Sequence, residues 1–301
     1  MNNFPRRPKP PWLTTRLPTT PAFGRTKCLL DSKGLHTVCE EARCPNRWEC
    51  FSRGTATFLI MGPICTRNCR FCSVASGIPR PLDPDEPHNI ADFVVKMGLS
   101  YVVLTSVTRD DLSDGGASHF VKVVSSITHV SPSSLVEVLV PDFKGDISAL
   151  STVLKSPVVV LNHNVETVPS LYSKVRPGAD YYRSLELLRK SREISPSLVV
   201  KSGIMVGLGE SIEEIEEVLL DLRDAGCDAV TIGQYLQPTR GNLEVVRYYT
   251  PEEFSYLEMR ALDMGFKVAL AGPFVRSSFK ARECYEKIRK KKERDYEDRV
   301  P

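Results

Sequence analysis

The chain has 301 residues, of which 42% are hydrophobic and 26% charged, and its formal net charge at pH 7 is +3. This is ordinary globular composition, and it excludes a disordered or collagen-like chain. No apolar run reaches the roughly 18 residues that cross a bilayer. The proline-rich, basic residues 1–12 lack the apolar core of a secretory signal, and the balanced charge does not indicate nucleic acid. We therefore expect a cytoplasmic protein with neither a membrane nor a nucleic acid as partner.

Residues 1–52 show few signs of regular structure, whereas seven apolar, β-branched runs beyond them predict strands. These runs are 55–62, 101–107, 135–140, 158–162, 198–206, 229–236 and 267–270. Their near-continuous hydrophobicity is typical of parallel strands that are buried on both faces.

Residues that begin and end helices lie between most of these runs. Asp83-Pro84-Asp85-Glu86 predicts an N-cap, a first-turn proline and a capping-box carboxylate, and Gly98 predicts the end of that helix. Similar signals predict helices over 211–226 and 250–265. The charged tail from Lys280 predicts a solvated helix or a frayed end.

Strands that alternate with helices predict βαβ units and an α/β fold. Six or seven units fit a partial TIM-like (β/α)6-type barrel, and a doubly wound open sheet is the alternative. We expect the barrel over 53–275, with extensions over 1–52 and 276–301. Polar residues follow the strand ends at 65–72, 109–111, 141–142, 163–164, 207–210 and 234–237. Barrel active sites are built from the loops at these ends, so we expect the polar residues to meet at one mouth.

Six of the nine cysteines lie between Cys39 and Cys72. An odd number of clustered cysteines does not fit a secreted disulfide framework and indicates metal in a reducing compartment. The motif Cys65-Thr-Arg-Asn-Cys69-Arg-Phe-Cys72 follows the first strand. Its three thiols can hold three irons of a cubane cluster and leave the fourth open to a small molecule. Structural zinc is the alternative, although no further ligand follows at a suitable spacing.

A second triplet, Cys39, Cys44 and Cys50, precedes the first strand. Three thiols without a nearby fourth again indicate a cluster, here one completed from elsewhere in the chain. The other cysteines are expected to be structural or incidental thiols, and they are Cys28, Cys227 and Cys284.

The spacing Cys-x3-Cys-x2-Cys after the first strand of a βα barrel resembles the radical S-adenosylmethionine (SAM) superfamily. The resemblance implies a [4Fe-4S] cluster on Cys65, Cys69 and Cys72, whose open iron binds the methionine part of SAM. It also implies reductive cleavage of SAM to a 5′-deoxyadenosyl radical that abstracts hydrogen from an unactivated C–H bond. The cofactor carries this chemistry, and the protein supplies position and excludes water.

The two triplets together resemble the lipoyl synthase family, and other stretches agree along most of the chain. These stretches are 105–116, 162–167, 201–210, 233–239 and 276–279. The resemblance implies that Cys39, Cys44, Cys50 and Ser278 hold an auxiliary [4Fe-4S] cluster. The family has Tyr where this chain has Phe279, so a hydroxyl is lost and the ring is kept. A serine oxygen is a hard donor beside soft thiolates, so its iron should be the easiest to release.

The resemblance further implies a sulfurtransferase that inserts two sulfur atoms at C6 and C8 of a protein-bound octanoyl-lysine. Two SAM molecules would be consumed, and the auxiliary cluster would supply the sulfur. The implied partners are octanoylated lipoyl-carrier domains, of a 2-oxoacid dehydrogenase E2 or the glycine cleavage H protein, and an electron donor such as ferredoxin or flavodoxin. The alternatives are another radical sulfur-inserting enzyme, such as biotin synthase or a methylthiotransferase, and a zinc- or cluster-stabilised binding module.

Several residues outside the triplets are candidates for binding SAM. Asn164 and Glu166 follow the fourth strand, and two roles stay open for them: contact with a ribose hydroxyl, or a pair that is satisfied within the loop. The stretch Gly203-x-Met205-x-Gly207-x-x-Glu210 resembles the adenine-contacting strand of the superfamily, although its glycines fit a tight strand exit equally well. The full set of candidates is Phe71, Thr105, Asn164, Glu166, Gly207 and Glu210.

Other polar residues near strand ends are assigned structural roles. Asp110 and Asp111 are predicted to be helix caps, because Asp is favoured at N-caps. His163 is predicted to be a hydrogen-bonded structural histidine. Ser277 and Ser278 would be read as turn caps if the matching cysteine triplet were absent. No general acid–base pair is evident, as expected for radical transfer.

Overall fold

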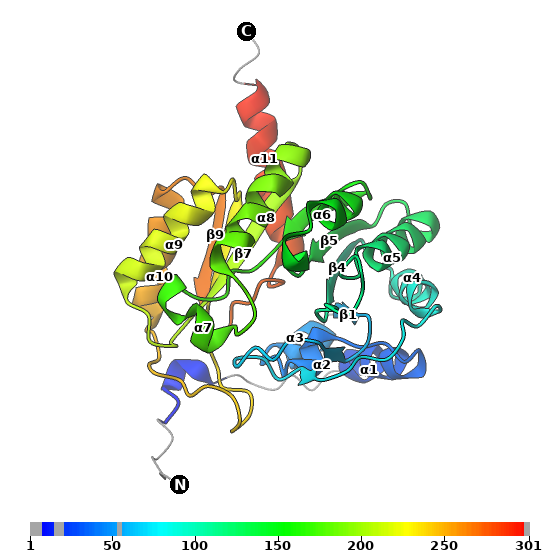
Figure 1. Cartoon of the computed structure of the whole chain (residues 1–301), viewed down its shortest axis with the longest axis horizontal. Helices are drawn as coiled ribbons and strands as arrows, with labels where there is room; N and C mark the ends of the chain where they lie inside the picture. Colours follow the sequence, from blue (N-terminus) through cyan, green and yellow to red (C-terminus); the bar gives the residue numbers. More distant parts are fainter. Residues whose placement is uncertain (1–7, 15–20, 53–55, 298–301) are drawn as a thin grey trace.

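A computed structural model describes residues 8–14, 21–52 and 56–297 (Figure 1). Seven of the described strands form one sheet whose order follows the chain, and all of its neighbouring pairs are parallel. They are β1 (Thr57–Ile60), β4 (Tyr101–Ser106), β5 (Leu135–Leu139), β6 (Val158–Asn162), β7 (Val199–Val206), β8 (Ala229–Gln234) and β9 (Val268–Gly272). Residue 55, where the first strand was expected to begin, lies outside the described residues.

Helices connect successive strands and surround the sheet (Figure 1). They are α4 (Glu86–Met97), α5 (Ala117–Val130), α6 (Ile147–Leu154), α8 (Tyr181–Ile194), α9 (Ile212–Asp224) and α10 (Pro251–Asp263). A strand order without reversal confirms the partial barrel and excludes the doubly wound sheet. The barrel is open because β1 and β9 are the two edges of the sheet.

The predicted helix boundaries are confirmed at three points and wrong at one. Capping boxes at Ser211 and Thr250 begin α9 and α10, and Gly98 ends α4 with a left-handed φ of 59°. However, α4 begins at Glu86 rather than after Asp83. The Glu86 carboxylate does not cap the helix, because it is buried and accepts bonds from the Met61 N–H (2.9 Å) and the His119 ring (2.6 Å).

Two apolar cores fill the space between sheet and helices, one beside β1, β4 and β5 and one beside β7 and β8. A third apolar cluster involves α11 (Ala281–Glu297), whose Cys284 and Ile288 pack on Val160, Val199 and Val268 of the strands. The expectation of a solvated tail is therefore wrong for one face of α11. Cys284 and Cys227 are buried thiols and Cys28 is exposed, as expected for structural or incidental cysteines.

The described residues of the N-terminal extension, 8–14 and 21–52, are largely helical, which corrects the expectation of loops. It contains the short 3-10 helix η1 (Pro11–Leu13), α1 (Pro21–Ser32), α2 (Val38–Glu41) and α3 (Arg47–Ser52). Leu30, Leu35 and Phe51 are buried in the same core as Phe58 of β1. The backbone N–H of Leu59 donates to the carbonyl of His36 at 2.9 Å, so the extension covers this edge strand. None of the helices in the described part of the chain has the length and apolar character of a bilayer span.

Candidate active site

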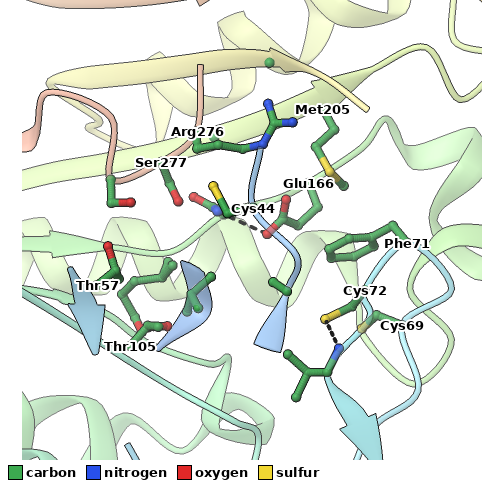
Figure 2. Close-up of a pocket in the computed structure, with 18 of the residues that line it drawn as sticks. Cys44, Thr57, Cys69, Phe71, Cys72, Thr105, Glu166, Met205, Arg276 and Ser277 are labelled. Atoms are coloured by element: carbon green, nitrogen blue, oxygen red, sulfur yellow. Dashed lines mark hydrogen bonds between the residues drawn. The ribbon is translucent and has the colours of Figure 1, made fainter. Parts of the chain in front are cut away.

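A cavity of about 590 Å³ opens at the carboxyl ends of the parallel strands (Figure 2). Its wall includes residues from the ends of β4, β5, β6, β7 and β8, from the N-terminal extension and from the segment after β9. The predicted site residues that line it are Cys39, Cys44, Cys65, Cys69, Phe71, Cys72, Thr105, Asn164, Glu166 and Ser278. The fold thus brings ten of the expected residues, from widely separated positions, to one mouth.

The first cysteine triplet begins at Cys65, the last residue of β2 (Ile64–Cys65), and Cys69 and Cys72 lie in the loop that leads to β3 (Ala75–Ser76). The sulfur of Cys65 accepts backbone N–H bonds from Arg67 (3.4 Å) and Thr108 (3.3 Å), and that of Cys72 accepts one from Val74 (3.4 Å). Such bonds stabilise negative charge on sulfur and tune the potential of an iron–sulfur cluster. This loop is therefore built to hold thiolates.

Burial opposes that charge when no metal is bound. It raises the pKa of Cys72 to about 12 and also raises the pKa of Cys69. Burial likewise raises the pKa of Cys39 in the second triplet to about 12. Thiols of this kind become thiolates when a cation coordinates them, with release of a proton. Among the described residues, no three His, Cys, Asp or Glu side chains are grouped around a point that would suit a single metal ion.

The second triplet comes from the N-terminal extension. Cys39 is on α2 and Cys44 follows that helix, and both line the cavity. Cys50, on α3, is partly buried and packs against the core beside β1, outside the cavity wall. Ser277 and Ser278 line the cavity from the segment after β9. Figure 2 shows Cys44 in the same part of the site as Ser277, away from Cys69 and Cys72.

Asn164 and Glu166 form a pair in the cavity wall. The Asn164 amide donates to the Glu166 carboxylate at 3.0 Å. Burial raises the pKa of Glu166, and the positive charge of Arg176 opposes this shift. Arg176 is itself buried and donates to the Asn164 carbonyl at 2.9 Å. A partly buried carboxylate beside an amide can bind hydroxyl or ammonium groups, so the pair can hold a polar ligand.

His163 confirms its predicted hydrogen bond and adds an acceptor to the site. Its Nδ1 bonds to the Val140 carbonyl at 2.8 Å, so Nδ1 carries the proton and Nε2 is an acceptor in the neutral ring. The structure gives Nε2 no partner among the described residues, although His163 lines the cavity. Burial lowers the pKa of His163 to about 4 and keeps the ring neutral near pH 7.

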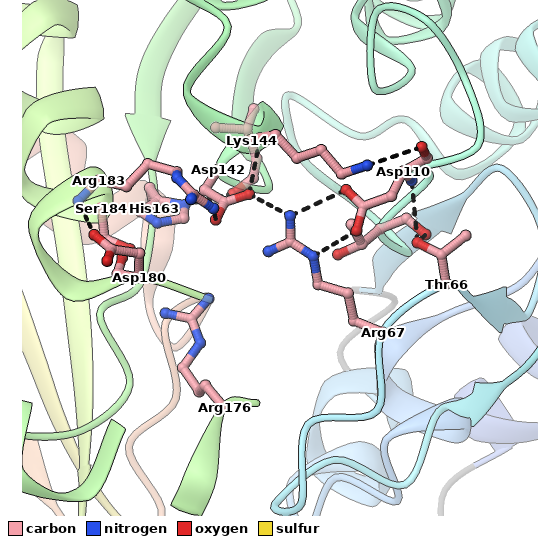
Figure 3. Close-up of polar contacts among 12 residues, drawn as sticks. Thr66, Arg67, Asp110, Asp142, Lys144, His163, Arg176, Asp180, Arg183 and Ser184 are labelled. Carbon is pink, nitrogen blue, oxygen red and sulfur yellow. Dashed lines mark hydrogen bonds and ion pairs between the residues drawn. The ribbon is translucent and has the colours of Figure 1, made fainter. Parts of the chain in front are cut away.

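The predicted capping role of Asp110 and Asp111 is wrong, because both carboxylates accept bonds from arginines. Arg67 donates to Asp110 at 2.7 Å and to the buried Asp142 at 2.6 Å (Figure 3). Arg109 donates to Asp111 at 2.8 Å. The Arg67 guanidinium holds the pKa of Asp142 at about 2, against the effect of burial. Arg67 therefore ties the first cysteine loop to the ends of β4 and β5.

Gly207 and Glu210 lie behind the cavity, outside the wall formed by the described residues. The Glu210 carboxylate accepts bonds from the Gly207 and Leu208 N–H groups and from the Tyr249 hydroxyl (2.9 Å). These contacts order the exit of β7. A role for the two residues in binding SAM stays a prediction.

The sequence interpretation missed four arginines in the cavity wall: Arg43, Arg67, Arg176 and Arg276. Arg67 and Arg276 lie within the quoted motifs, which was an available signal. Arg176 follows the short helix α7 (Tyr172–Val175), where no motif marks it. Only the path of the chain brings it back to Asn164.

Comparisons with known proteins agree with this geometry. The pattern described as the radical SAM superfamily matches residues 59–222, and the N-terminal domain of lipoyl synthase matches 2–44. A lipoyl synthase from Laribacter hongkongensis is 55% identical over 91% of this chain and 87% of its own length. One from Caldanaerobacter subterraneus is 54% identical over 91% and 95%. The chain belongs to the lipoyl synthase family.

A likeness among solved structures concerns the fold alone. The crystal structure of methylornithine synthase has a TM-score of 0.53 at 17% identity, over 68% of this chain and 61% of its own. Membership of the lipoyl synthase family makes the protein a sulfurtransferase of the radical SAM type, with SAM and [4Fe-4S] clusters as cofactors and a lipoyl-carrier protein as substrate. The alternatives of a biotin synthase, a methylthiotransferase and a zinc-stabilised module are thereby set aside.

Proposed function

We propose that Cys65, Cys69 and Cys72 hold the SAM-binding [4Fe-4S] cluster of this lipoyl synthase. Ser278 and the triplet Cys39, Cys44 and Cys50 hold the auxiliary cluster. The observation that carries this assignment is that members of both sets line one cavity, with Ser278 joining them from near the other end of the chain. The N–H bonds to the sulfurs of Cys65 and Cys72 fit thiolate ligands.

When bound, these groups supply one-electron reduction, hydrogen abstraction and sulfur for C6 and C8 of an octanoyl-lysine. The chain itself positions the reactants and excludes water. Phe71 packs with Tyr235 and Met205 at the edge of the cavity, where its ring shields the first cluster. Thr105 donates its hydroxyl proton to the Leu139 carbonyl at 3.0 Å, which leaves its oxygen lone pairs for a ligand.

Asn164 and Glu166 are proposed to bind the hydroxyl groups of SAM. Their mutual bond fixes the amide and the carboxylate in one orientation, and Arg176 fixes the backbone beneath them. Gly207 and Glu210 contribute from behind by holding the end of β7 in place. We assign all six candidates, Phe71 and Thr105 included, to SAM binding.

The wider setting follows from the same family. We propose octanoylated domains of a 2-oxoacid dehydrogenase E2 or of the glycine cleavage H protein as substrates, and ferredoxin or flavodoxin as electron donor. A cytoplasmic location fits the reduced state in which the cysteine ligands must be kept.

An isotope experiment tests the sulfur source. Enzyme whose clusters carry 34S receives one equivalent of octanoylated carrier peptide, SAM and dithionite, with unlabelled sulfide in the buffer. We expect a lipoyl product with heavy sulfur at both positions. Unlabelled product would contradict the role of the auxiliary cluster as donor.

The Ser278→Cys variant tests the ligand set. A fourth thiolate should hold the auxiliary cluster more firmly, so the cluster assembles but turnover is slow or absent. Wild-type turnover by this variant would contradict the idea that the serine-bound iron must leave easily.

A further inference from the structure

We propose that Asn46, together with Gly233, positions the segment that carries Ser278 against the second cysteine triplet. This inference rests on the proposed role of Ser278 as a ligand. It assigns the placement of that ligand to two residues outside the ligand set, and it makes the stability of the auxiliary cluster depend on them.

Asn46 lies between Cys44 and Cys50, and it is bonded in two directions. Its side-chain amide donates to the Phe274 carbonyl at 2.7 Å, across 228 residues of sequence. Its own carbonyl accepts the N–H of Cys50 at 2.9 Å. The side chain is largely buried, with 8% of the residue exposed. One residue therefore connects the cysteine segment to the serine segment.

The chain between Phe274 and Ser278 is tightly turned, so a fixed Phe274 restricts Ser278. The Val275 N–H donates to the Gly272 carbonyl at 3.1 Å, and the Phe279 N–H donates to the Arg276 carbonyl at 2.8 Å. The Arg276 guanidinium also bonds to the Val275 carbonyl at 2.6 Å. These bonds leave the segment few ways to move independently of Phe274.

Gly233 of β8 sets the position of the same segment from the barrel. A Cβ atom at residue 233 would lie 2.2 Å from the Val275 oxygen, far inside van der Waals contact. Because the obstacle is backbone, any side chain at this position must push the segment away. The backbone of Gly233 itself is not in the left-handed region, so this close approach is what requires glycine.

The physical role follows from the chemistry of the ligands. A serine oxygen is a poor match for iron compared with a thiolate, so its binding depends on being held in place beforehand. Groups that orient a metal ligand without touching the metal change affinity by about 10- to 100-fold when removed. We assign Asn46 and Gly233 to this class of positioning residues.

The test measures how fast the auxiliary cluster loses iron. Holoenzyme with SAM bound, so that the open iron of the other cluster is covered, is mixed anaerobically with a ferrous chelator. Loss of Fe²⁺ from [4Fe-4S]²⁺ leaves [3Fe-4S]⁰ and needs no oxidant. We expect Asn46→Ala to release one iron about 10-fold faster than wild type. Asn89→Ala, the same change on α4, should match wild type.

Ser278→Ala and the double variant Asn46→Ala/Ser278→Ala separate positioning from general damage. If Asn46 acts through Ser278, the double variant loses iron no faster than Ser278→Ala. A further acceleration in the double variant would overturn the proposal. If Asn46→Ala releases iron at the wild-type rate while Ser278→Ala releases it faster, the proposal for Asn46 is overturned and the assignment of Ser278 as a ligand stands. If Ser278→Ala releases iron no faster than wild type, the assignment of Ser278 as a ligand is itself overturned.

A second variant keeps the test valid if Asn46→Ala does not fold. Gly233→Ala should release the same iron faster, since it displaces Val275. Gly24→Ala is its control, because a Cβ at residue 24 meets no atom within 4 Å. Equal rates for these two glycine variants would overturn the proposal.

Discussion

Buried polar side chains in the barrel interior are tolerated because most of them are paired. Lys201 and Glu137 are each 1% exposed and form a salt bridge of 3.1 Å, and the Tyr101 hydroxyl donates to the other Glu137 oxygen at 2.6 Å. Burial is the main cause that raises the pKa of Tyr101. The negative charge of Glu137 and the hydrogen bond to it raise that pKa further. Removing one member of such a group leaves a charge without compensation.

We expect Lys201→Met to lower the free energy of unfolding by about 3–5 kcal/mol, because it leaves the Glu137 carboxylate buried and unpaired. The measurement is anaerobic urea denaturation. Lys190→Met, which breaks an exposed pair with Glu193, should leave the midpoint unchanged. Adding Glu137→Leu to Lys201→Met should recover much of the loss, and a failure to do so would point to packing instead.

His163 predicts a dependence of stability on pH. Its folded-state pKa is about 4, below the unfolded value of about 6.5, so the unfolded chain binds one proton more between these values. Stability should therefore fall as the pH drops through this window. The slope due to His163 approaches about 1.4 kcal/mol per pH unit.

His163→Gln keeps a neutral polar side chain and removes the titration. Urea midpoints of this variant between pH 7.5 and 5.5 should fall less steeply than those of wild type. His129→Gln, on α5, serves as the control for a general loss of histidine charge. Equal slopes for His163→Gln and wild type would show that His163 titrates normally.

Among the elements, α11 covers the end of the barrel that lies opposite the site. Its outer face is strongly charged, but Ile288 is fully buried against strand residues such as Val199 and Ala229. Lys292 of the same helix donates to the Ser197 and Leu198 carbonyls at 3.2 Å. Amphipathic helices gain most of their stability from such tertiary packing, not from propensity.

Truncating Ile288 should therefore lower the free energy of unfolding much more than its place in a charged tail suggests. We expect Ile288→Ala to lower the free energy of unfolding by about 2–5 kcal/mol through a cavity beneath the barrel. Ile194→Ala, at a side chain that is 40% exposed, should cost far less. Thermal melting of the two variants under anaerobic conditions makes the comparison, and equal losses would contradict the packing described for α11.

On the scale of the whole molecule, the N-terminal extension returns to the mouth of the barrel, where it meets the loop before α10 and the segment after β9. The Trp12 indole donates to the Tyr249 carbonyl at 3.1 Å, and Asn46 bonds to Phe274 after β9. The two proposed ligand sets share no residue. All of their cysteines lie within residues 39–72, and only Ser278 comes from the carboxyl-terminal part of the chain. We therefore expect the clusters to assemble independently.

Cluster counting tests this independence. Replacing Cys65, Cys69 and Cys72 by Ala should leave about four irons and four sulfides per chain, held by the auxiliary set. The corresponding triple variant of the second triplet should also retain about four of each. Iron and sulfide analysis after anaerobic reconstitution gives the result. Loss of all iron in either variant would show that one cluster requires the other.

Much of this arrangement is predictable from local sequence. The strands follow from continuous β-branched runs, and the capping boxes at Ser211 and Thr250 follow from residues three positions apart. The cysteine spacings indicate iron–sulfur clusters because the ligands of each loop are neighbours in the chain. All of these patterns involve residues close together in the sequence, so they can be recognised without knowledge of the fold.

Tertiary structure decided the rest, because burial and partner choice depend on contacts between distant segments. The sequence predicts Glu86 to be a capping-box residue, yet its carboxylate accepts hydrogen bonds from the Met61 N–H and the His119 ring instead. Arg176 enters the cavity wall only because the chain returns to Asn164. Asn46 reads as an ordinary loop residue until the fold brings Phe274 within 2.7 Å of its amide. A hydrogen bond across 228 residues has no local pattern, so the sequence by itself could not predict it.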